Sequence, residues 1–244
     1  MLTEAETEYK VRVLKHTYKS HIVLQFEILN TLEDQLIENV MAEVDAIDGF
    51  NVQAYLPAKQ CKYNEPALAY TVLQFDHTLG CEELDLNGVL SCTLKFTVKD
   101  IDPQNPDEDT DDIEGFDDEY ALEEVELAVA DHVQKVWKAN FDVAWDELNE
   151  AVEVQDTFVL STIPTLEQAV TDLQKFLGLY AQEKTEKIPE GQGSHLLLLA
   201  GVFRGGHDIL ARAKLVLSKD GVTMELTVRS PDEDAAQFIA SAVA

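Results

Sequence analysis

The chain has 244 residues, of which 45% are hydrophobic, and this is enough to form a sizeable core in one or two domains. Its 47 acidic residues against 18 basic ones give a formal charge of −29 at pH 7. Because phosphate contacts need clustered Lys and Arg, this balance argues against nucleic acid as the main ligand and against direct binding to an anionic membrane.

Neither end of the chain reads as a targeting or membrane segment. The acidic start MLTEAETEYK lacks the apolar stretch of a signal peptide, and the apolar run at 196–203 is far shorter than the about 20 residues that span a bilayer. The three cysteines, Cys61, Cys81 and Cys92, are odd in number and lack CxxC spacing. We therefore expect a reduced, cytosolic protein in which the thiols are ordinary core or strand residues.

The first 100 residues read as short strands separated by turn signals. Branched and aromatic residues or alternating apolar residues mark strands at 21–29, 51–57, 68–76 and 89–100. In the last of these, the apolar side chains fall on one face and the polar ones on the other, which is the period of a half-buried strand. Several strands at this spacing predict a β-sandwich.

An acidic segment with two prolines, 101–119, interrupts this pattern, and its charge density predicts a solvated loop. Asp107, Asp109 and Asp111 fit positions 1, 3 and 5 of a calcium-binding loop, but Asp112 stands where Gly is needed and Asp118 where Glu is needed. The segment predicts weak cation binding rather than a specific calcium site. The pattern of residues 120–129 then predicts a last strand of the sandwich.

The second half mixes helices with strands. An amphipathic helix is predicted at 164–178, where Thr165 and Gln168 form a capping box and Gly178 ends the helix. Apolar runs predict strands at 195–203, 207–218 and 222–230, joined by turns at Gly205-Gly206 and Asp220-Gly221, and a closing helix at 232–244. We expect an α+β domain with a three- or four-stranded antiparallel sheet at 132–244, separate from the sandwich at 1–131.

The stretch NFDVAWDELN, 140–149, places Phe141, Trp145 and Leu148 on one stripe if it is helical. The stripe could form a core contact or a surface that meets a partner, and the spacing alone favours a core contact. Three of the four arginines, Arg204, Arg212 and Arg229, follow residue 200. They either pair with local acids or gather beside an exposed aromatic and recognise carboxylates of a peptide.

Catalytic motifs such as GxSxG, HExxH or a P-loop do not occur in the chain. An alternative function, a hydrolase or metal-dependent enzyme, would have to use His207 and Asp208 or the acidic segment. Neighbours on a strand face opposite sides, so His207 and Asp208 are poorly placed to act as a pair. We expect no catalytic residue, no metal and no cofactor.

The chain resembles the C-terminal appendage (ear) domain of the gamma subunit of coatomer, the COPI vesicle coat. The stretches that carry the resemblance are LTEAETEY, KFTVKDIDP, ADHVQKVWKANFDVAWDE, STIPTLEQAVTDLQKFLG and LLLAGVFRGGHDILARAKL, in order along the whole chain. The resemblance implies an immunoglobulin-like sandwich at 1–131 followed by a platform of antiparallel sheet and helices at 132–244, as in the appendages of clathrin adaptors. A long α-solenoid trunk would precede this segment. Such appendages bind regulatory and accessory proteins and catalyse nothing.

The family's platform carries an FxxxW motif, which is Phe141 and Trp145 here. The resemblance implies that Trp145 lies in an exposed hydrophobic site flanked by Arg212 and Arg229, while Phe141 faces the core. The implied partner is a GTPase-activating protein for the small GTPase Arf, of the coatomer-dependent type. Other coatomer subunits would bind the rest of the full-length chain. The implied location is the cytoplasm, peripheral on Golgi membranes and COPI-coated vesicles.

Overall fold

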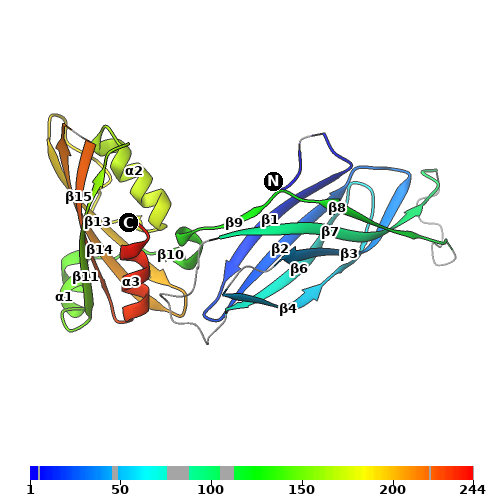
Figure 1. The fold of residues 1–244 in the computed structure, drawn as a ribbon, viewed down its shortest axis with the longest axis horizontal. Helices are drawn as coiled ribbons and strands as arrows, with labels where there is room; N and C mark the ends of the chain where they lie inside the picture. Colours follow the sequence, from blue (N-terminus) through cyan, green and yellow to red (C-terminus); the bar gives the residue numbers. More distant parts are fainter. Residues whose placement is uncertain (5, 46–48, 76–87, 105–112, 220, 244) are drawn as a thin grey trace. The chain divides into compact units, whose positions relative to one another are not determined.

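The computed structural model describes residues 1–244 apart from 5, 46–48, 76–87, 105–112, 220 and 244. The chain forms two compact units, Met1–Leu127 and Ala128–Ala244, each with its own sheets (Figure 1). The boundary falls slightly before the predicted one, so that residues 128–131 belong to the second unit.

The first unit contains two antiparallel sheets. One runs in the order β1 (Tyr9–Thr17), β2 (His21–Asn30), β6 (Pro66–Phe75), β4 (Phe50–Leu56). The other runs in the order β5 (Ala58–Cys61), β3 (Gln35–Asp45), β7 (Gly88–Asp100), β8 (Phe116–Ala121), and β9 (Val125–Leu127) also pairs with β7. The hydroxyl of Thr71 on β6 donates to the carbonyl of Ala42 on β3 over 2.7 Å and so links the two sheets.

Alternating burial explains this sandwich. Side chains along β2 and β7 alternate between buried and more accessible positions. On β7 the predicted inward face is buried as expected: Leu90, Cys92, Leu94, Phe96 and Val98. An apolar face of this kind must pack against a second layer, and the two sheets meet this need. The prediction of an immunoglobulin-like β-sandwich is confirmed.

The acidic segment is only partly a loop, and the prediction of loop structure up to residue 119 is wrong. Phe116–Ala121 forms β8 and pairs with β7, although its side chains are mostly exposed. A strand pairs through its backbone N–H and C=O groups, which acidic side chains pointing to solvent do not prevent. The charge pattern of the segment therefore does not reveal this strand. Of the residues compared with a calcium-binding loop, Asp107, Asp109, Asp111 and Asp112 lie outside the described residues, and Asp118 lies on β8.

The second unit is one antiparallel sheet with helices. The strands run in the order β10 (Val133–Lys135), β13 (Ser194–Phe203), β14 (His207–Ser218), β15 (Gly221–Ser230), β11 (Val152–Leu160), and β12 (Tyr180–Ala181) pairs with β13. The helices are the 3-10 helix η1 (Val129–His132), α1 (Phe141–Glu147), α2 (Leu166–Leu177) and α3 (Glu233–Ser241). The single strand predicted at 120–129 is divided in the structure between the end of β8 at Ala121 and the separate strand β9, and η1 begins at Val129.

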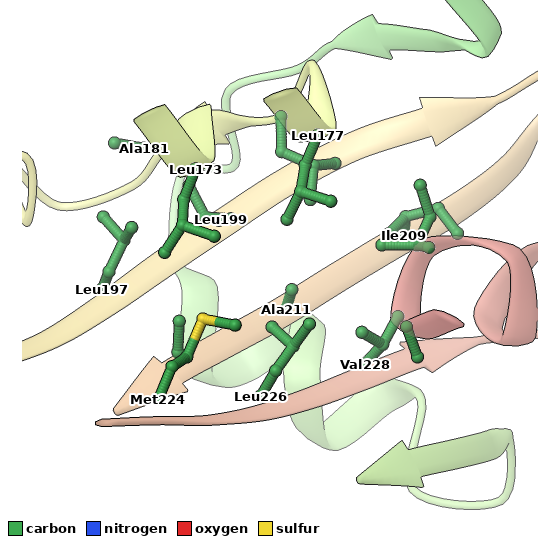
Figure 2. Close-up of a cluster of buried hydrophobic side chains, with 14 of the residues drawn as sticks. Leu173, Leu177, Ala181, Leu197, Leu199, Ile209, Ala211, Met224, Leu226 and Val228 are labelled. Carbon is green, nitrogen blue, oxygen red and sulfur yellow. The ribbon is translucent and has the colours of Figure 1, made fainter. Parts of the chain in front are cut away.

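The main core of this unit lies between the sheet and helices α2 and α3 (Figure 2). Figure 2 shows Leu173 and Leu177 of α2 above alternate residues of β13, β14 and β15, among them Leu199, Ala211 and Leu226. Because side chains alternate along a strand, the residues between these positions point to the opposite face of the sheet.

The helix α2 has the predicted start and end, but Phe176, expected on its buried stripe, is 46% exposed. The side chain of Thr165 accepts a hydrogen bond from the backbone N–H of Gln168 at 3.2 Å. Gly178 follows the helix with φ 66°, and a Cβ at this position would come within 2.7 Å of Ala130. The long strands β13, β14 and β15 agree with the predicted ranges to within a residue at each end. The sheet has more strands than predicted because β10, β11 and β12 join it.

Candidate functional site

Helix α1 is short and is fixed at both ends by side chains. Asn140 caps its start, where the Asn140 Oδ1 accepts from the N–H of Val143 at 3.1 Å. The N–H of Phe141 donates to the Glu183 carboxylate at 3.2 Å. At the other end, a guanidinium N–H of Arg229 donates to the carbonyl of Trp145 at 2.9 Å. These contacts satisfy backbone groups that a helix leaves unpaired at its termini.

The helix lies on the sheet face opposite α2 and α3. Its inner stripe forms a small separate cluster whose buried members are Phe141, Trp145, Leu198, Ala200 and Leu210. The rings of Phe141 and Trp145 are stacked, with centroids 5.7 Å apart. The partners Leu198, Ala200 and Leu210 are the β13 and β14 residues that point away from the main core.

The expectation that Trp145 is accessible is wrong. Only 4% of its surface is exposed, because two arginines from the neighbouring strands lie over the indole. The guanidinium carbon of Arg212 on β14 lies 4.1 Å from the ring centroid, and that of Arg229 on β15 lies 4.5 Å away. A cation above an indole face is attracted by the ring, and covering the ring also removes apolar area from water. Phe141, at 0% exposure, faces the core as expected.

The structure confirms that Arg212 and Arg229 pair with local acids, and it also brings these two arginines together, although around a buried aromatic residue rather than an exposed one. Arg212 pairs with Asp142 at 2.9 Å, and Arg229 pairs with Glu153 at 2.6 Å, so each has a local acid. The two guanidinium groups also gather around one aromatic residue, Trp145. Local pairing and gathering on one surface are therefore not exclusive.

The two ion pairs differ in accessibility. The Asp142 side chain is 74% exposed and that of Arg212 is 34% exposed, whereas Arg229 is 19% exposed and also holds the end of α1. The Nε atom of Arg212 is buried and has no hydrogen-bond acceptor among the described residues. An exposed ion pair contributes about 0–1 kcal/mol, so another carboxylate can replace Asp142 on Arg212 at little cost. Of the two arginines, Arg212 has the more exposed side chain and the more exposed acidic partner.

The sequence reasoning missed the exposed tryptophan. Trp137 lies between β10 and α1, and 67% of its surface is exposed. The available signal was its position in VQKVWK, outside any helical or strand stripe that would bury it. Val143 on the outer side of α1 is also exposed, at 53%.

The residues of the enzymatic alternative contact different partners. The His207 Nε2 lies 3.7 Å from a carboxylate oxygen of Asp232, while Asp208 pairs with Lys138 at 2.8 Å. Within the described part of the chain, no group of three His, Cys, Asp or Glu side chains is arranged to hold a metal ion. Arg204, the third arginine after residue 200, lies over the Phe203 ring rather than over Trp145.

The described cysteines are buried thiols. Burial raises the pKa of Cys92 to about 12 and also raises the pKa of Cys61, so neither thiol is an activated nucleophile at neutral pH. Cys81 lies outside the described residues. None of the helices in the described ranges is both long and apolar enough to cross a membrane.

Comparison with known proteins places both units in one family. Residues 1–128 match the family model described as coatomer gamma subunit appendage platform subdomain, and residues 130–243 match that of the coatomer subunit gamma-1 C-terminal appendage platform. The first description thus applies the word platform to the unit that has the sandwich fold. Among solved structures, the GAE domain of yeast GGA1 aligns with a TM-score of 0.30 and 10% identity over 50% of this chain and 96% of that one, from which we infer nothing.

Full-length relatives agree over nearly the whole chain. Coatomer subunit gamma-1 of Mus musculus is 47% identical over 243 residues, which are 99% of this chain and 27% of the mouse protein. Coatomer subunit gamma-1 of Homo sapiens is 47% identical over 242 residues, and coatomer subunit gamma-2 of Danio rerio is 44% identical over 242 residues, with the same shares of each chain. The chain spans about a quarter of the length of these relatives. It belongs to the family of coatomer gamma-subunit appendages.

Proposed function

We propose that this chain is a non-catalytic interaction appendage of the COPI vesicle coat. It recruits regulatory and accessory proteins, among them an Arf GTPase-activating protein of the coatomer-dependent type, to the platform surface at Arg212 and Arg229, which cover the buried Trp145 and Phe141. The observation that supports this most strongly is the convergence of two arginines from different strands over one tryptophan. An Arg cluster beside an aromatic residue is typical of binding hot spots.

Binding proceeds by exchange of an ion-pair partner. A carboxylate of the partner replaces Asp142 on Arg212, and the Arg212 Nε, which is buried without an acceptor among the described residues, gains one when the guanidinium adjusts. Guanidinium forks suit carboxylates because they donate two parallel hydrogen bonds. In this mechanism the Trp145 ring holds both guanidinium groups in place, and Phe141 anchors α1 to the sheet.

The appendage acts as part of a larger assembly. Other coatomer subunits bind the rest of the full-length chain, and the protein works in the cytoplasm, peripheral on Golgi membranes and COPI-coated vesicles. It needs no metal or cofactor for this role. The sandwich and the platform, Met1–Leu127 and Ala128–Ala244, serve as the two subdomains of the appendage.

A matched pair of charge reversals tests the proposal. Arg212→Glu should weaken binding of the Arf GTPase-activating protein about thirtyfold or more, the effect of losing about 2 kcal/mol at a hot spot. Arg12→Glu is the control, because Arg12 forms a similar exposed ion pair, with Glu27 at 2.6 Å, in the sandwich unit. Affinity measured by isothermal titration calorimetry at two salt concentrations should fall with salt for the wild type. Equal affinity of both variants would place the partner elsewhere.

A further inference from the structure

A second binding feature lies on the same sheet face, beyond the part that α1 covers. A pocket of about 600 Å³ is formed where the turn after β12 passes over the first half of β13 and the middle of β14. Lys184 and Lys187 line it from the turn, Lys214 lines it from β14, and Leu196 and Pro189 supply apolar surface.

The charge of this pocket is opposite to that of the chain. Its lining includes three lysines and no Asp or Glu, in a protein that has 47 acids against 18 bases. Glu225 is the cross-strand neighbour of Lys214, yet none of the ion pairs found among the described residues involves Lys184, Lys187 or Lys214. Three ammonium groups around one concave surface attract an anionic ligand.

The turn that carries two of the lysines is held by many hydrogen bonds. The Gln182 side chain is fully buried, accepts from the N–H of Lys138 at 2.7 Å and donates to the carbonyls of Val136 and Tyr180. The Thr185 hydroxyl accepts from the N–H of Leu198 at 3.1 Å and donates to the carbonyl of Gln182 at 2.8 Å.

Two consecutive residues of this turn, Glu183 and Lys184, adopt left-handed backbone conformations with φ of 53° and 61°. Residues other than glycine rarely adopt such φ values, and these backbone conformations persist only where the surrounding structure enforces them. The turn therefore holds the backbone of Lys184 in a fixed position over the start of β13, and the pocket is largely formed before any ligand binds.

The pocket continues the surface around Arg212. Lys214 follows Arg212 by two residues on β14, so both side chains point to the same face with Cα atoms about 7 Å apart. In register, Leu196 is opposite Lys214 and Leu198 is opposite Arg212. Leu196 is 47% exposed, and Val216, opposite the lining residue Ser194, is 39% exposed. The face thus offers basic groups and apolar side chains side by side.

We propose that this pocket binds an acidic peptide segment of a partner protein, with carboxylates between the three lysines and an apolar side chain on Leu196. An acidic segment matches both the lysines and the apolar surface, and a concave site fits side chains better than a flat membrane surface. The inference rests on the proposed function in one respect: the segment that reaches the pocket extends from the one that pairs with Arg212.

The test uses a defined probe and the whole 244-residue chain. A fluorescein-labelled peptide of alternating Glu and Leu is titrated and its anisotropy measured, beside a matched peptide with Gln in place of Glu. The variants are Lys184→Glu with Lys187→Glu, and Lys214→Glu. The control is Lys19→Glu with Lys59→Glu, which makes the same charge change at exposed lysines of the sandwich unit. The melting temperature of each variant is measured as well.

We expect the pocket variants to bind the acidic peptide about tenfold more weakly or worse with an unchanged melting temperature, and the control to stay within about twofold. The Gln peptide should bind weakly to all of them. Equal binding of the two peptides, or an equal loss in pocket and control variants, would overturn the proposal. So would binding to phosphatidylserine vesicles, lost in the pocket variants, without binding to the peptide. Capture of the Arf GTPase-activating protein by the Arg212→Glu protein reports on the proposed function separately, because the peptide titration does not involve that partner.

Discussion

Replacing Trp145 by Ser removes the indole that Arg212 and Arg229 cover. Burying a tryptophan of about 150–250 Å² is worth about 4–6 kcal/mol as an upper bound, and each cation–π contact adds roughly 0.5–2 kcal/mol. Part of this lost free energy is recovered in the variant because both guanidinium groups can become hydrated. We therefore expect a loss of about 3–5 kcal/mol in the free energy of unfolding of the second unit, the range for core aromatic truncations. This should lower its melting temperature by at least about 10 °C.

Differential scanning calorimetry measures this loss, and hydrogen exchange of the α1 amides shows whether the helix detaches from the sheet first. The matched control is Trp137→Ser, because Trp137 is 67% exposed where Trp145 is 4% exposed. Exposed substitutions usually change stability by less than about 0.5 kcal/mol. If the two serine variants melted within a degree or two of each other, the burial of Trp145 under the arginines would be refuted.

Three further predictions concern single residues. Phe141→Ser should destabilise the second unit by about 3–5 kcal/mol in urea unfolding, since Phe141 is fully buried against Trp145; wild-type stability would show that α1 does not pack as described. Gly178→Ala should destabilise it by more than about 1 kcal/mol, because φ is 66° and the new Cβ meets Ala130 at 2.7 Å, whereas Gly193→Ala, where a Cβ meets nothing within 4 Å, should not. Burial alone raises the pKa of Glu38, but hydrogen bonds from Gln60 and Lys99 outweigh it and hold the pKa below 4.5. Since this pKa is lowered on folding, its contribution to sandwich stability is present above about pH 4.5 and is lost as the pH falls through the folded-state value; unfolding curves of Glu38→Gln between pH 3 and 6 should lack that part of the pH dependence.

Local signals predicted much of the fold. The Thr165 cap on the N–H of Gln168, the glycine at 178 and the alternating pattern of 89–100 act over a few residues, and each was found in the structure. The edge strand β11 was missed although alternate apolar residues of it are half-buried against the main core: Val152, Val154, Phe158 and Leu160. Asp156 interrupts this alternation in the middle of the strand.

The site was only partly predictable for a different reason. The helical spacing of Phe141 and Trp145 indicated a shared apolar stripe, and the stripe exists. The cover of Trp145 comes from β14 and β15, and Arg229 is 84 residues from Trp145 in sequence. Contacts over such a separation depend on strand order and register, which periodicity does not specify. Sequence spacing therefore favoured the burial of Trp145 that the structure shows, whereas the expectation of an accessible tryptophan came from the family resemblance and is wrong.

The central claim is that a partner carboxylate replaces Asp142 on Arg212, and the affinity of the Arf GTPase-activating protein for Asp142→Asn and Arg212→Glu tests it most directly. Removing the competing carboxylate should strengthen binding by up to about fivefold, the value of an exposed ion pair of up to about 1 kcal/mol, while reversing the arginine weakens binding. The predicted result is that Asp142→Asn raises the affinity and Arg212→Glu lowers it, although the two residues form one ion pair. If Asp142→Asn bound more weakly than the wild type at an unchanged melting temperature, the exchange would be contradicted, and Asp142 itself would be part of the surface that the partner needs.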